Sequence, residues 1–342
     1  MTFTLRIRQE DSTIAVGTGE TILAAALAAG VAYPHGCQAG NCGACKSRLH
    51  RGTVEMMPYS SYALSAGEKA AGLILACRAL PCSDVEVAWL EGDESAIHPW
   101  RRLDCRVVAL DQLTHDIKRV RLEVLAGGPF VFSAGQYARV AFRGQPARDY
   151  SMANGPTEAT LEFHIRALAD GRSSHYVARH LTLGEEVALE GPFGTSHWRP
   201  THIGPVLAIA GGSGLAPIKS IVETALRHGV AQPIRLYFGV RDERDLYLEE
   251  HFAALARHHP NLGFIPVLSE PRRATRRRTG FVHDAVRADH ASFAGWKAYL
   301  AGPPVMVEAA SAMLGACGMA AEDIHADAFY TEAEKAGMPA SV

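Results

Sequence analysis

Four cysteines have a spacing that suits an iron–sulfur cluster. Three thiols follow the pattern C-x4-C-x2-C, and a fourth lies far downstream. Four thiolates with this spacing are typical ligands of a [2Fe–2S] cluster. The loop must fold back sharply around two irons, and Gly36, Gly40 and Gly43 permit this because glycine adopts positive φ at little cost. The predicted cluster ligands are Cys37, Cys42, Cys45 and Cys77.

Other readings of these cysteines remain open. A structural zinc site usually has paired C-x2-C units, whereas only Cys42-Gly-Ala-Cys45 is present. That unit could also be a thioredoxin-like redox pair, although such a pair opens a helix after a strand. His35 suggests a Rieske centre, but no Cys-x2-His follows it. The remaining cysteines, which we expect to be small buried residues, are Cys82, Cys105 and Cys317.

A second group of residues could bind a phosphorylated aromatic cofactor. Arg148 offers a guanidinium for a phosphate, Tyr150 offers a ring for stacking, and Ser151 offers a hydroxyl for a heterocycle. A Gly-x-x-Ser sequence precedes a helical run over residues 174–181, and a helix N-terminus attracts phosphate. The candidate positions that follow Ser151 are His164, Ile165, Arg166, Gly171 and Ser174, with Gly-Pro-Phe-Gly ending at Gly194.

A glycine run in the last third of the chain suits a pyrophosphate. It reads Gly211-Gly212-Ser213-Gly214-Leu-Ala-Pro217 and lies between an apolar run and a helical pattern. It is not a P-loop, because no Gly-Lys-Ser/Thr occurs there. It is also not the plain Gly-x-Gly-x-x-Gly sequence, because proline stands at its final position.

The surrounding patterns predict three domains and a linker. Residues 1–91 contain alternating strands and an Ala-rich helix, which is a β-grasp arrangement. Residues 92–101 carry charge, glycine and proline without periodicity and are predicted to be a linker. Residues 102–200 contain repeated short strands, which favours an antiparallel β-barrel. In residues 201–342 strands and helices alternate strictly, which predicts a doubly wound α/β fold with a parallel sheet.

Composition narrows the function further. The chain has 342 residues and a formal net charge of −2, so no basic excess suggests a nucleic-acid partner. The most apolar stretch, residues 21–30, is half of what a membrane span needs. The alternating N-terminus has no signal-peptide architecture. Seven cysteines, an odd number, argue for reduced ligand thiols and a cytoplasmic location.

Two segments of the chain resemble known protein families. Residues 1–91 resemble plant-type ferredoxins in element order and cysteine spacing. The series R-x-Y-S, a strand arginine, G-x-x-S and G-P-F-G resembles the ferredoxin–NADP reductase superfamily. This resemblance implies that Tyr150 packs on a flavin ring and that Ser151 has a catalytic place near its N5 edge. It implies that Arg148, Gly171 and Ser174 hold the pyrophosphate, with the strand residues His164, Ile165 and Arg166 at the same site. The domain order implies FAD.

The glycine run and a second motif resemble the nicotinamide-nucleotide domain of that superfamily. The second motif, Ala301-Gly302-Pro303-Pro-Val-Met306, has alanine where the superfamily often has cysteine. In such proteins a C-terminal aromatic covers the flavin, and Phe329 is the catalytic candidate here. The nucleotide contacts implied are Gly211, Gly212, Ser213, Gly214, Arg241, Gly302, Pro303 and Met306.

The preferred nucleotide is predicted to be NADH, with NADPH still possible. Glu270 places a carboxylate where an NADPH enzyme often has arginine, and carboxylates favour a 2′-hydroxyl over a phosphate. The basic residues near this position could instead recruit NADPH, dock a partner or simply be solvated. They are Arg272, Arg273, Arg276, Arg277 and Arg278.

Taken over nearly its whole length, the chain resembles NADH-dependent reductase components of bacterial multicomponent oxygenases. The expected function is electron transfer from NADH through FAD and a [2Fe–2S] cluster to a terminal oxygenase. The favoured acceptor is a Rieske-type aromatic-ring dioxygenase. A diiron monooxygenase, a nucleotide-sugar reductase activity and non-enzymatic redox sensing are the alternatives. The expected partner is the oxygenase or a separate ferredoxin, with neither nucleic acid nor membrane. Which oxygenase and which organic substrate are not predicted.

Overall fold

The chain divides into two compact units. The first comprises Met1–Ser95, Phe193–Thr195 and Tyr330–Val342, and the second comprises Ala96–Pro192 and Ser196–Phe329. The computed structural model describes residues 2–10, 13–31, 33–35, 38, 40, 43–60, 63–64, 66–90, 98–331 and 334. Among these residues, no helix is both long enough and apolar enough to cross a membrane.

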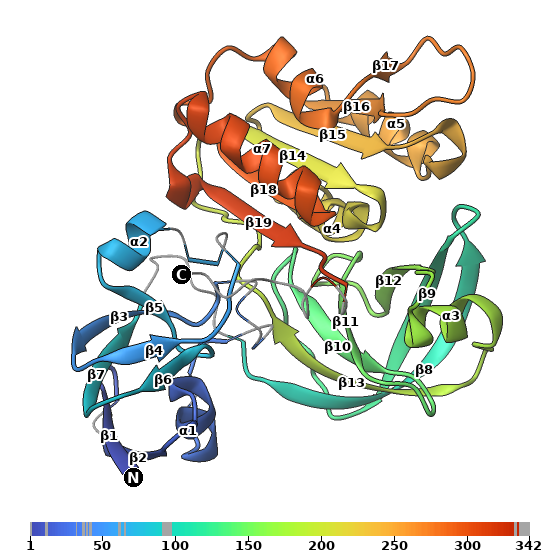
Figure 1. Cartoon of the computed structure of the whole chain (residues 1–342). Coiled ribbons are helices and arrows are strands. Elements are labelled where there is room, and N and C mark those ends of the chain that lie inside the picture. The colour runs from blue at the N-terminus through green and yellow to red at the C-terminus, as the bar shows by residue number, and fades with distance from the viewer. Residues whose placement is uncertain are drawn as a thin grey trace. The chain divides into compact units, whose positions relative to one another are not determined.

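The first unit contains a five-stranded sheet in the order β2-β1-β7-β3-β5 (Figure 1). Strands β1 and β7 are parallel, whereas the other neighbouring pairs are antiparallel. Helix α1 begins after Thr21, whose Oγ1 accepts a hydrogen bond from the Ala24 amide at 3.2 Å. This confirms the predicted β-grasp arrangement. The bounds are β1 Thr2–Ile7, β2 Thr13–Gly17, α1 Ile22–Ala28, β3 Lys46–Arg51, β4 Val54–Met56, α2 Ala66–Ala70, β5 Leu73–Leu75, β6 Ala79–Pro81 and β7 Val85–Trp89.

The second unit begins with a six-stranded antiparallel barrel. Its order is β11-β10-β13-β8-β9-β12, and a bridge between Met152 and Phe163 closes the two ends. Helix α3 begins at Arg172, earlier than predicted, because Gly171 takes the N-cap position. The bounds are β8 Arg101–Gln112, β9 Ile117–Ala126, β10 Tyr137–Ala141, β11 Arg148–Ser151, β12 Leu161–Arg166, α3 Arg172–Arg179 and β13 Glu186–Phe193.

The second sheet of this unit is wholly parallel, as the strict alternation predicts. Its order is β17-β16-β15-β14-β18-β19, and α6 and α7 lie side by side on one face of it (Figure 1). Every residue of β14 is buried, which explains its continuous apolar sequence. The bounds are β14 Val206–Gly211, η1 Gly212–Gly214, α4 Leu215–Arg227, β15 Ile234–Val240, η2 Glu243–Asp245, α5 Glu249–His258, β16 Leu262–Leu268, β17 Arg278–Thr279, α6 Val282–Asp289, β18 Lys297–Gly302, α7 Pro304–Ala316, η3 Ala321–Asp323 and β19 Ile324–Ala328.

Helix α4 joins the α/β module to the barrel within this unit. The Lys219 ammonium donates to the Ala153 carbonyl at 3.1 Å, and the Ser220 hydroxyl donates to the Asn154 carbonyl at 2.6 Å. Both carbonyls lie just beyond β11, so these bonds connect the helix after the glycine run with the strand that carries Ser151.

Two histidines of the second unit, buried His197 and half-buried His325, lie in cationic surroundings. Burial, with the Arg199 guanidinium second, lowers the pKa of His197 to about 4. Burial, followed by Arg199 and Lys297, lowers the pKa of His325 to about 3. The His325 ring stacks on Tyr299, with centroids 5.3 Å apart. Both imidazoles are therefore held neutral at physiological pH.

These histidines predict acid sensitivity. Their pKa values are lower in the folded than in the unfolded chain, so unfolding takes up protons between about pH 6.5 and pH 4. We expect the apparent melting temperature to fall across this range, with His197 alone contributing on the order of 3 kcal/mol at its acid end. The measurement is thermal unfolding followed by circular dichroism from pH 8 to pH 5. The variant His197→Gln should show a shallower fall, whereas His258→Gln at an exposed histidine should match wild type; equal slopes for all three proteins would contradict this.

Candidate functional site

Two of the predicted cluster ligands meet beside strands β3 and β5. Cys45 and Cys77 are 3% and 5% exposed, and the Cys77 amide donates to the Cys45 Sγ at 3.4 Å. Pairing of Lys46 with Leu75 across the two strands brings these distant thiols together. An amide donated to sulfur stabilises a thiolate, which is the form that binds iron. The buried thiols therefore fit a cluster.

The other half of the cysteine loop is only partly described. Cys37, Cys42 and Gly36 lie outside the described residues. Gly40 and Gly43 have φ values of +76° and +70°. A Cβ at Gly40 would lie 2.8 Å from the Tyr59 Cβ, so both conformation and space require glycine there.

Strand β11 presents the predicted flavin ligands on the barrel. Arg148 and Tyr150 pair with Val140 and Ala138 of β10 and share one face of the strand, since side chains alternate. The Arg148 Nη1 donates to the adjacent Ala147 carbonyl at 2.8 Å. Burial raises the pKa of the Tyr150 hydroxyl, which keeps this ring neutral. A guanidinium and a neutral ring on one face fit a phosphorylated aromatic cofactor.

Ser151 has a partner that the sequence did not reveal. Its Oγ donates to Asp327 Oδ2 at 3.2 Å, across 176 residues of chain. Asp327 lies on β19, the last strand of the α/β module. Docking of the two modules therefore fixes the Ser151 hydroxyl, and no local pattern around Asp327 indicates this.

The predicted phosphate turn at α3 is built mainly from backbone. The Ser174 hydroxyl donates to the Gly171 carbonyl at 3.0 Å and accepts from the Leu168 amide at 3.1 Å. It is thus used inside the turn. No side chain caps α3, which leaves its first-turn amides as the groups that could meet an anion.

The side chains of the three β12 residues predicted beside the flavin lie in different environments. Ile165 is 2% exposed and packs in the barrel core, and the His164 side chain is completely enclosed. Only Arg166 faces the nucleotide cavity. Any contact of the first two residues with a cofactor would therefore involve their backbone, and their place at the flavin site stays a prediction.

The two nucleotide motifs pack against each other at adjacent parallel strands. Ala210 of β14 pairs with Ala301 of β18. A Cβ at Gly214 would lie 2.1 Å from the Ala301 carbonyl oxygen, and one at Gly302 would lie 2.9 Å from the Gly211 carbonyl oxygen. Both loops are therefore restricted to glycine at these positions, and together they leave room for a pyrophosphate.

A cavity of about 500 Å³ lies in front of these loops within the second unit. This volume suits a nucleotide-sized ligand. Ser213 lies in η1, between Gly212 and Gly214. Among the residues lining the cavity are Asp116, Arg166, Gly211, Gly212, Arg241, Asp245, Ser269, Pro303 and Met306.

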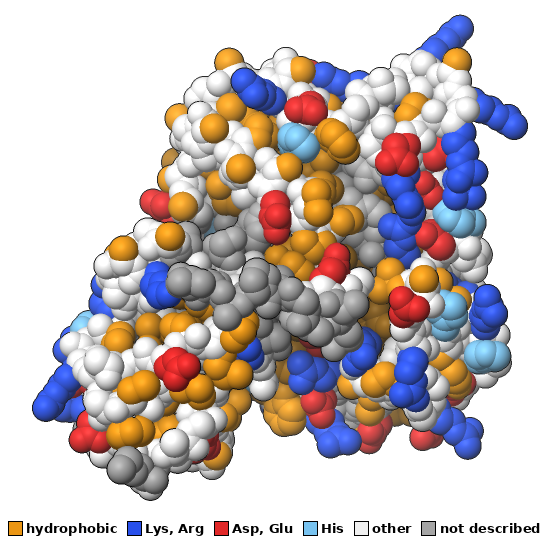
Figure 2. All heavy atoms as spheres, viewed as in Figure 1, with side chains coloured by type: hydrophobic (Ala, Val, Ile, Leu, Met, Phe, Trp, Pro, Cys, Tyr) orange, Lys and Arg blue, Asp and Glu red, His pale blue; other side chains and the backbone are white. Residues whose placement is uncertain are grey.

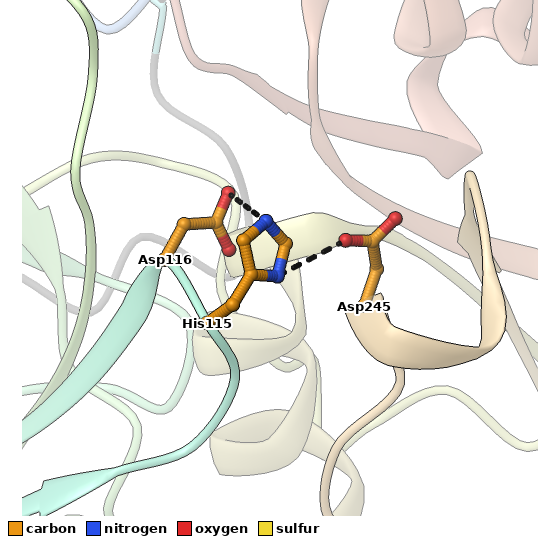
Figure 3. A group of neighbouring side chains, drawn as sticks. All are labelled: His115, Asp116 and Asp245. Atoms are coloured by element: carbon orange, nitrogen blue, oxygen red, sulfur yellow. Dashed lines mark ion pairs between the residues drawn. The ribbon is translucent and has the colours of Figure 1, made fainter.

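Asp116 and Asp245, which the sequence did not single out, line the cavity, and His115 lies between them (Figure 3). His115 Nδ1 lies 3.6 Å from Asp245 Oδ1, and its Nε2 lies 3.9 Å from Asp116 Oδ2. Burial opposes ionisation of Asp116, but Thr114 and Arg166 outweigh it and hold the pKa of this carboxyl below its usual range. The barrel and the α/β module each contribute to this group, so no sequence spacing could have predicted it.

Most of the arginines after β16 are in ion pairs. Arg272 lies 3.7 Å from Asp242, and Arg277 contacts Glu243 at 2.8 Å and Glu249 at 2.6 Å. Arg278 pairs with Asp289. Figure 2 shows basic and acidic side chains interleaved over this part of the surface. The basic run is thus largely neutralised by its neighbours.

Phe329 follows β19 beside the second nucleotide motif. Its amide donates to the Gly302 carbonyl at 2.9 Å, and its side chain packs against the core of the α/β module. Its predicted role as a flavin cover stays a prediction.

The geometry and the family comparisons define the same class of protein. A 2Fe-2S iron-sulfur cluster binding domain matches residues 5–82, an oxidoreductase FAD-binding domain matches residues 104–198, and an oxidoreductase NAD-binding domain matches residues 208–312. The protein is therefore an oxidoreductase that uses a [2Fe–2S] cluster, FAD and a nicotinamide nucleotide, NAD(P)H.

Full-length relatives narrow this class. The reductase component of naphthalene 1,2-dioxygenase/salicylate 5-hydroxylase systems from Ralstonia is 42% identical, over 92% of this chain and 94% of the relative. That of the naphthalene 1,2-dioxygenase system from Pseudomonas putida is 39% identical, over 95% and 98%. The crystal structure of an Amycolatopsis cytochrome P450 reductase matches with a TM-score of 0.77 and 35% identity, over 96% and 99%. The chain belongs to the family of ferredoxin–NAD(P)+ reductase components of oxygenase systems.

The placement of Arg148 yields a test of the flavin site. Arg148→Ala removes the guanidinium that shares one face of β11 with the Tyr150 ring. We expect flavin occupancy, measured from the 450 nm absorbance per protein, to fall at least about tenfold, which is the loss of one or two charge-assisted hydrogen bonds. Arg143→Ala, at an exposed arginine just after β10, is the matched control. Full flavin retention in Arg148→Ala would contradict the assignment.

Proposed function

We propose that this chain carries electrons from NADH, through FAD and the [2Fe–2S] cluster, to a ferredoxin that serves an aromatic-ring dioxygenase of the Rieske type. The observation that carries this proposal is the near-full-length similarity to the two naphthalene 1,2-dioxygenase reductase components, both named as ferredoxin–NAD(P)+ reductases. Plant-type clusters have reduction potentials near about −400 mV, whereas Rieske centres lie between about −150 and +300 mV. Electron transfer from a plant-type cluster to a Rieske centre is therefore thermodynamically favourable.

The residues of the second unit would position the reacting groups. FAD, when bound, accepts two electrons as a hydride and passes them on singly, so it can link NADH with a one-electron cluster. Tyr150 would support its ring, and Arg148 with the α3 amides would hold its phosphates. The Ser151 hydroxyl, oriented by Asp327 at 3.2 Å, would stand at the edge of the ring where the hydride arrives. Phe329 would cover the ring until NADH enters.

We further propose that Cys37, Cys42, Cys45 and Cys77 all ligate the cluster. The buried contact between Cys45 and Cys77 supports this assignment for half of the set. A cytoplasmic location would keep these ligands reduced.

The cluster assignment predicts a selective loss of activity. In Cys77→Ser we expect NADH-driven reduction of cytochrome c to fall at least about tenfold, because a hydroxyl is a poor substitute for a thiolate ligand. Reduction of ferricyanide, which can accept electrons directly from the flavin, should be retained. Cys82→Ser, at an exposed cysteine of the same unit, should behave as wild type. Unchanged cytochrome c reduction in Cys77→Ser would show that the electrons do not pass through the cluster.

We propose NADH as the preferred nucleotide. Arg241 lines the cavity, and its carbonyl accepts from the Glu270 amide at 2.8 Å, so the backbone of an acidic residue lies next to Arg241. The ion pairs of Arg272, Arg277 and Arg278 reduce their availability for a 2′-phosphate. A 2′-hydroxyl suits such a site better than a doubly charged phosphate.

The proposed preference for NADH predicts that reversing the charge of Glu270 weakens the discrimination against NADPH. Wild type should show a kcat/KM for NADH at least about tenfold above that for NADPH, and Glu270→Arg should narrow the ratio by about tenfold because it exchanges repulsion for attraction. The measurement is ferricyanide reduction with each nucleotide. Glu250→Arg, the same charge change at an exposed position of α5, should leave the ratio unchanged. A wild-type preference for NADPH would refute the proposal.

The module limits are also proposed. We place the cluster domain at residues 1–91, the linker at 92–101, the flavin domain at 102–200 and the nucleotide domain at 201–342. The ranges of the three family matches, residues 5–82, 104–198 and 208–312, support these limits because each falls inside one of them.

A further inference from the structure

A chain of hydrogen bonds runs from the barrel to the nucleotide loop. Glu162 Oε1 lies 3.0 Å from His164 Nε2, and His164 Nδ1 lies 3.3 Å from the Tyr247 hydroxyl. That hydroxyl lies 3.2 Å from the carbonyl oxygen of Gly212, which it can reach as a donor. Glu162, His164 and Tyr247 are 3%, 4% and 4% exposed, so water does not substitute for these partners.

The end of this chain is part of the nucleotide cavity. Gly212 lines the cavity and has a φ of +53°. A Cβ on it would lie 3.0 Å from the Arg166 Nη1, so this peptide is confined on one side by Arg166 and bonded on the other by Tyr247. Arg166 and His164, the partner of Tyr247, both lie on β12. Glu162, His164 and Arg166 occupy alternate positions on one face of that strand.

The charges around His164 favour its neutral form. Burial lowers the pKa of this imidazole, against the opposing effect of Glu162, and Lys219 and Arg119 lower it further. Glu162 stays ionised: burial opposes this, but His164, Lys219 and Arg121 together hold the pKa of its carboxyl far below the usual range. An ionised carboxylate only accepts, so the single imidazole proton must be on Nε2 and Nδ1 must be an acceptor.

One hydroxyl proton then faces two acceptors. Tyr247 can donate to His164 Nδ1 or to the Gly212 carbonyl, but not fully to both. Burial raises the pKa of Tyr247, so the hydroxyl keeps its proton and remains a donor. His164 therefore competes with the nucleotide loop for the same hydrogen bond.

We propose that Tyr247 is a positioning residue for the nicotinamide nucleotide, whose hydroxyl holds the Gly212 peptide, and that neutral His164 weakens this hold by competing for the hydroxyl proton. Neither residue needs to touch the nucleotide. The inference rests on the proposed use of NADH at this cavity and adds residues that control how tightly it binds.

The first test compares two buried tyrosines. In Tyr247→Phe the Gly212 carbonyl loses its donor, and we expect the Kd for NADH to rise about three- to tenfold, the worth of one neutral hydrogen bond, with the limiting rate of flavin reduction within about twofold of wild type. Both values come from the NADH dependence of the 450 nm decay in stopped flow. Tyr237→Phe is the control, because that tyrosine is also buried in the module but donates to Asp289 at 2.6 Å. It should leave the Kd unchanged, and equal Kd values for all three proteins would overturn the proposal.

The second test uses the opposite sign expected at His164. His164→Gln retains a donor for Glu162 but removes the Nδ1 acceptor, so the Kd for NADH should decrease by up to about threefold. A purely structural role would instead loosen binding in both variants. In the double variant the effect of His164→Gln should vanish, since the competing hydroxyl is gone. An unchanged or weaker affinity for NADH in His164→Gln, or additive effects in the double variant, would overturn the competition.

The outcomes separate the two proposals. Failure of wild type to reduce its flavin with NADH would refute the proposed function itself. Normal NADH reduction in wild type with an unchanged Kd in Tyr247→Phe would refute only the positioning role. Flavin content and circular dichroism establish that each variant is folded, and the comparison of Tyr247→Phe with Tyr237→Phe tests the role of Tyr247 independently of any variant at His164.

Discussion

The buried carboxylate of Glu162 connects the flavin barrel to the nucleotide module. Glu162 accepts from Arg121 of β9 at 2.8 Å, from His164 of β12 at 3.0 Å, and pairs with Lys219 of α4 at 3.5 Å. An unpaired charge at this depth would cost several kcal/mol, so the cations must stay in place as long as Glu162 is ionised. Because α4 begins directly after the glycine run, this ion pair network also sets the position of the nucleotide loop relative to β11.

The second constraint is the close approach of two loops at the point where the strand order reverses. The sheet runs from β14 to β15 in one direction and to β18 in the other, and ligands of doubly wound sheets bind at such a switch point. Here the loop after β14 and the loop after β18 touch through backbone atoms, which is possible only with glycine at positions 214 and 302. Hydride transfer requires the nicotinamide and flavin to meet, and the bonds from α4 to the segment after β11 bring their modules together.

Much of the architecture could be predicted from local patterns. Period-2 alternation and the strand–helix order gave the three modules, because these patterns report which faces are buried. Individual roles were harder to predict. His164 and Ile165 stay predicted cofactor contacts, but Ile165 packs in the barrel core and His164 contacts Tyr247, so the sequence did not reveal where their side chains lie. Ser174 stays a predicted phosphate contact, and the bond of its hydroxyl within its own turn could not be predicted from the sequence.

The sequence by itself determined the chemistry that the chain can support. The cysteine spacing, the glycine runs and the R-x-Y-S strand are local motifs, and the residue types and spacing of a short segment limit which group it can bind. The tertiary structure alone decided which distant groups meet. Ser151 contacts Asp327, His115 lies between Asp116 and Asp245, and Tyr247 contacts His164 only because the barrel and the α/β module dock. These contacts depend on side-chain direction and on packing between elements far apart in the chain, and neither leaves a periodic signal in the sequence.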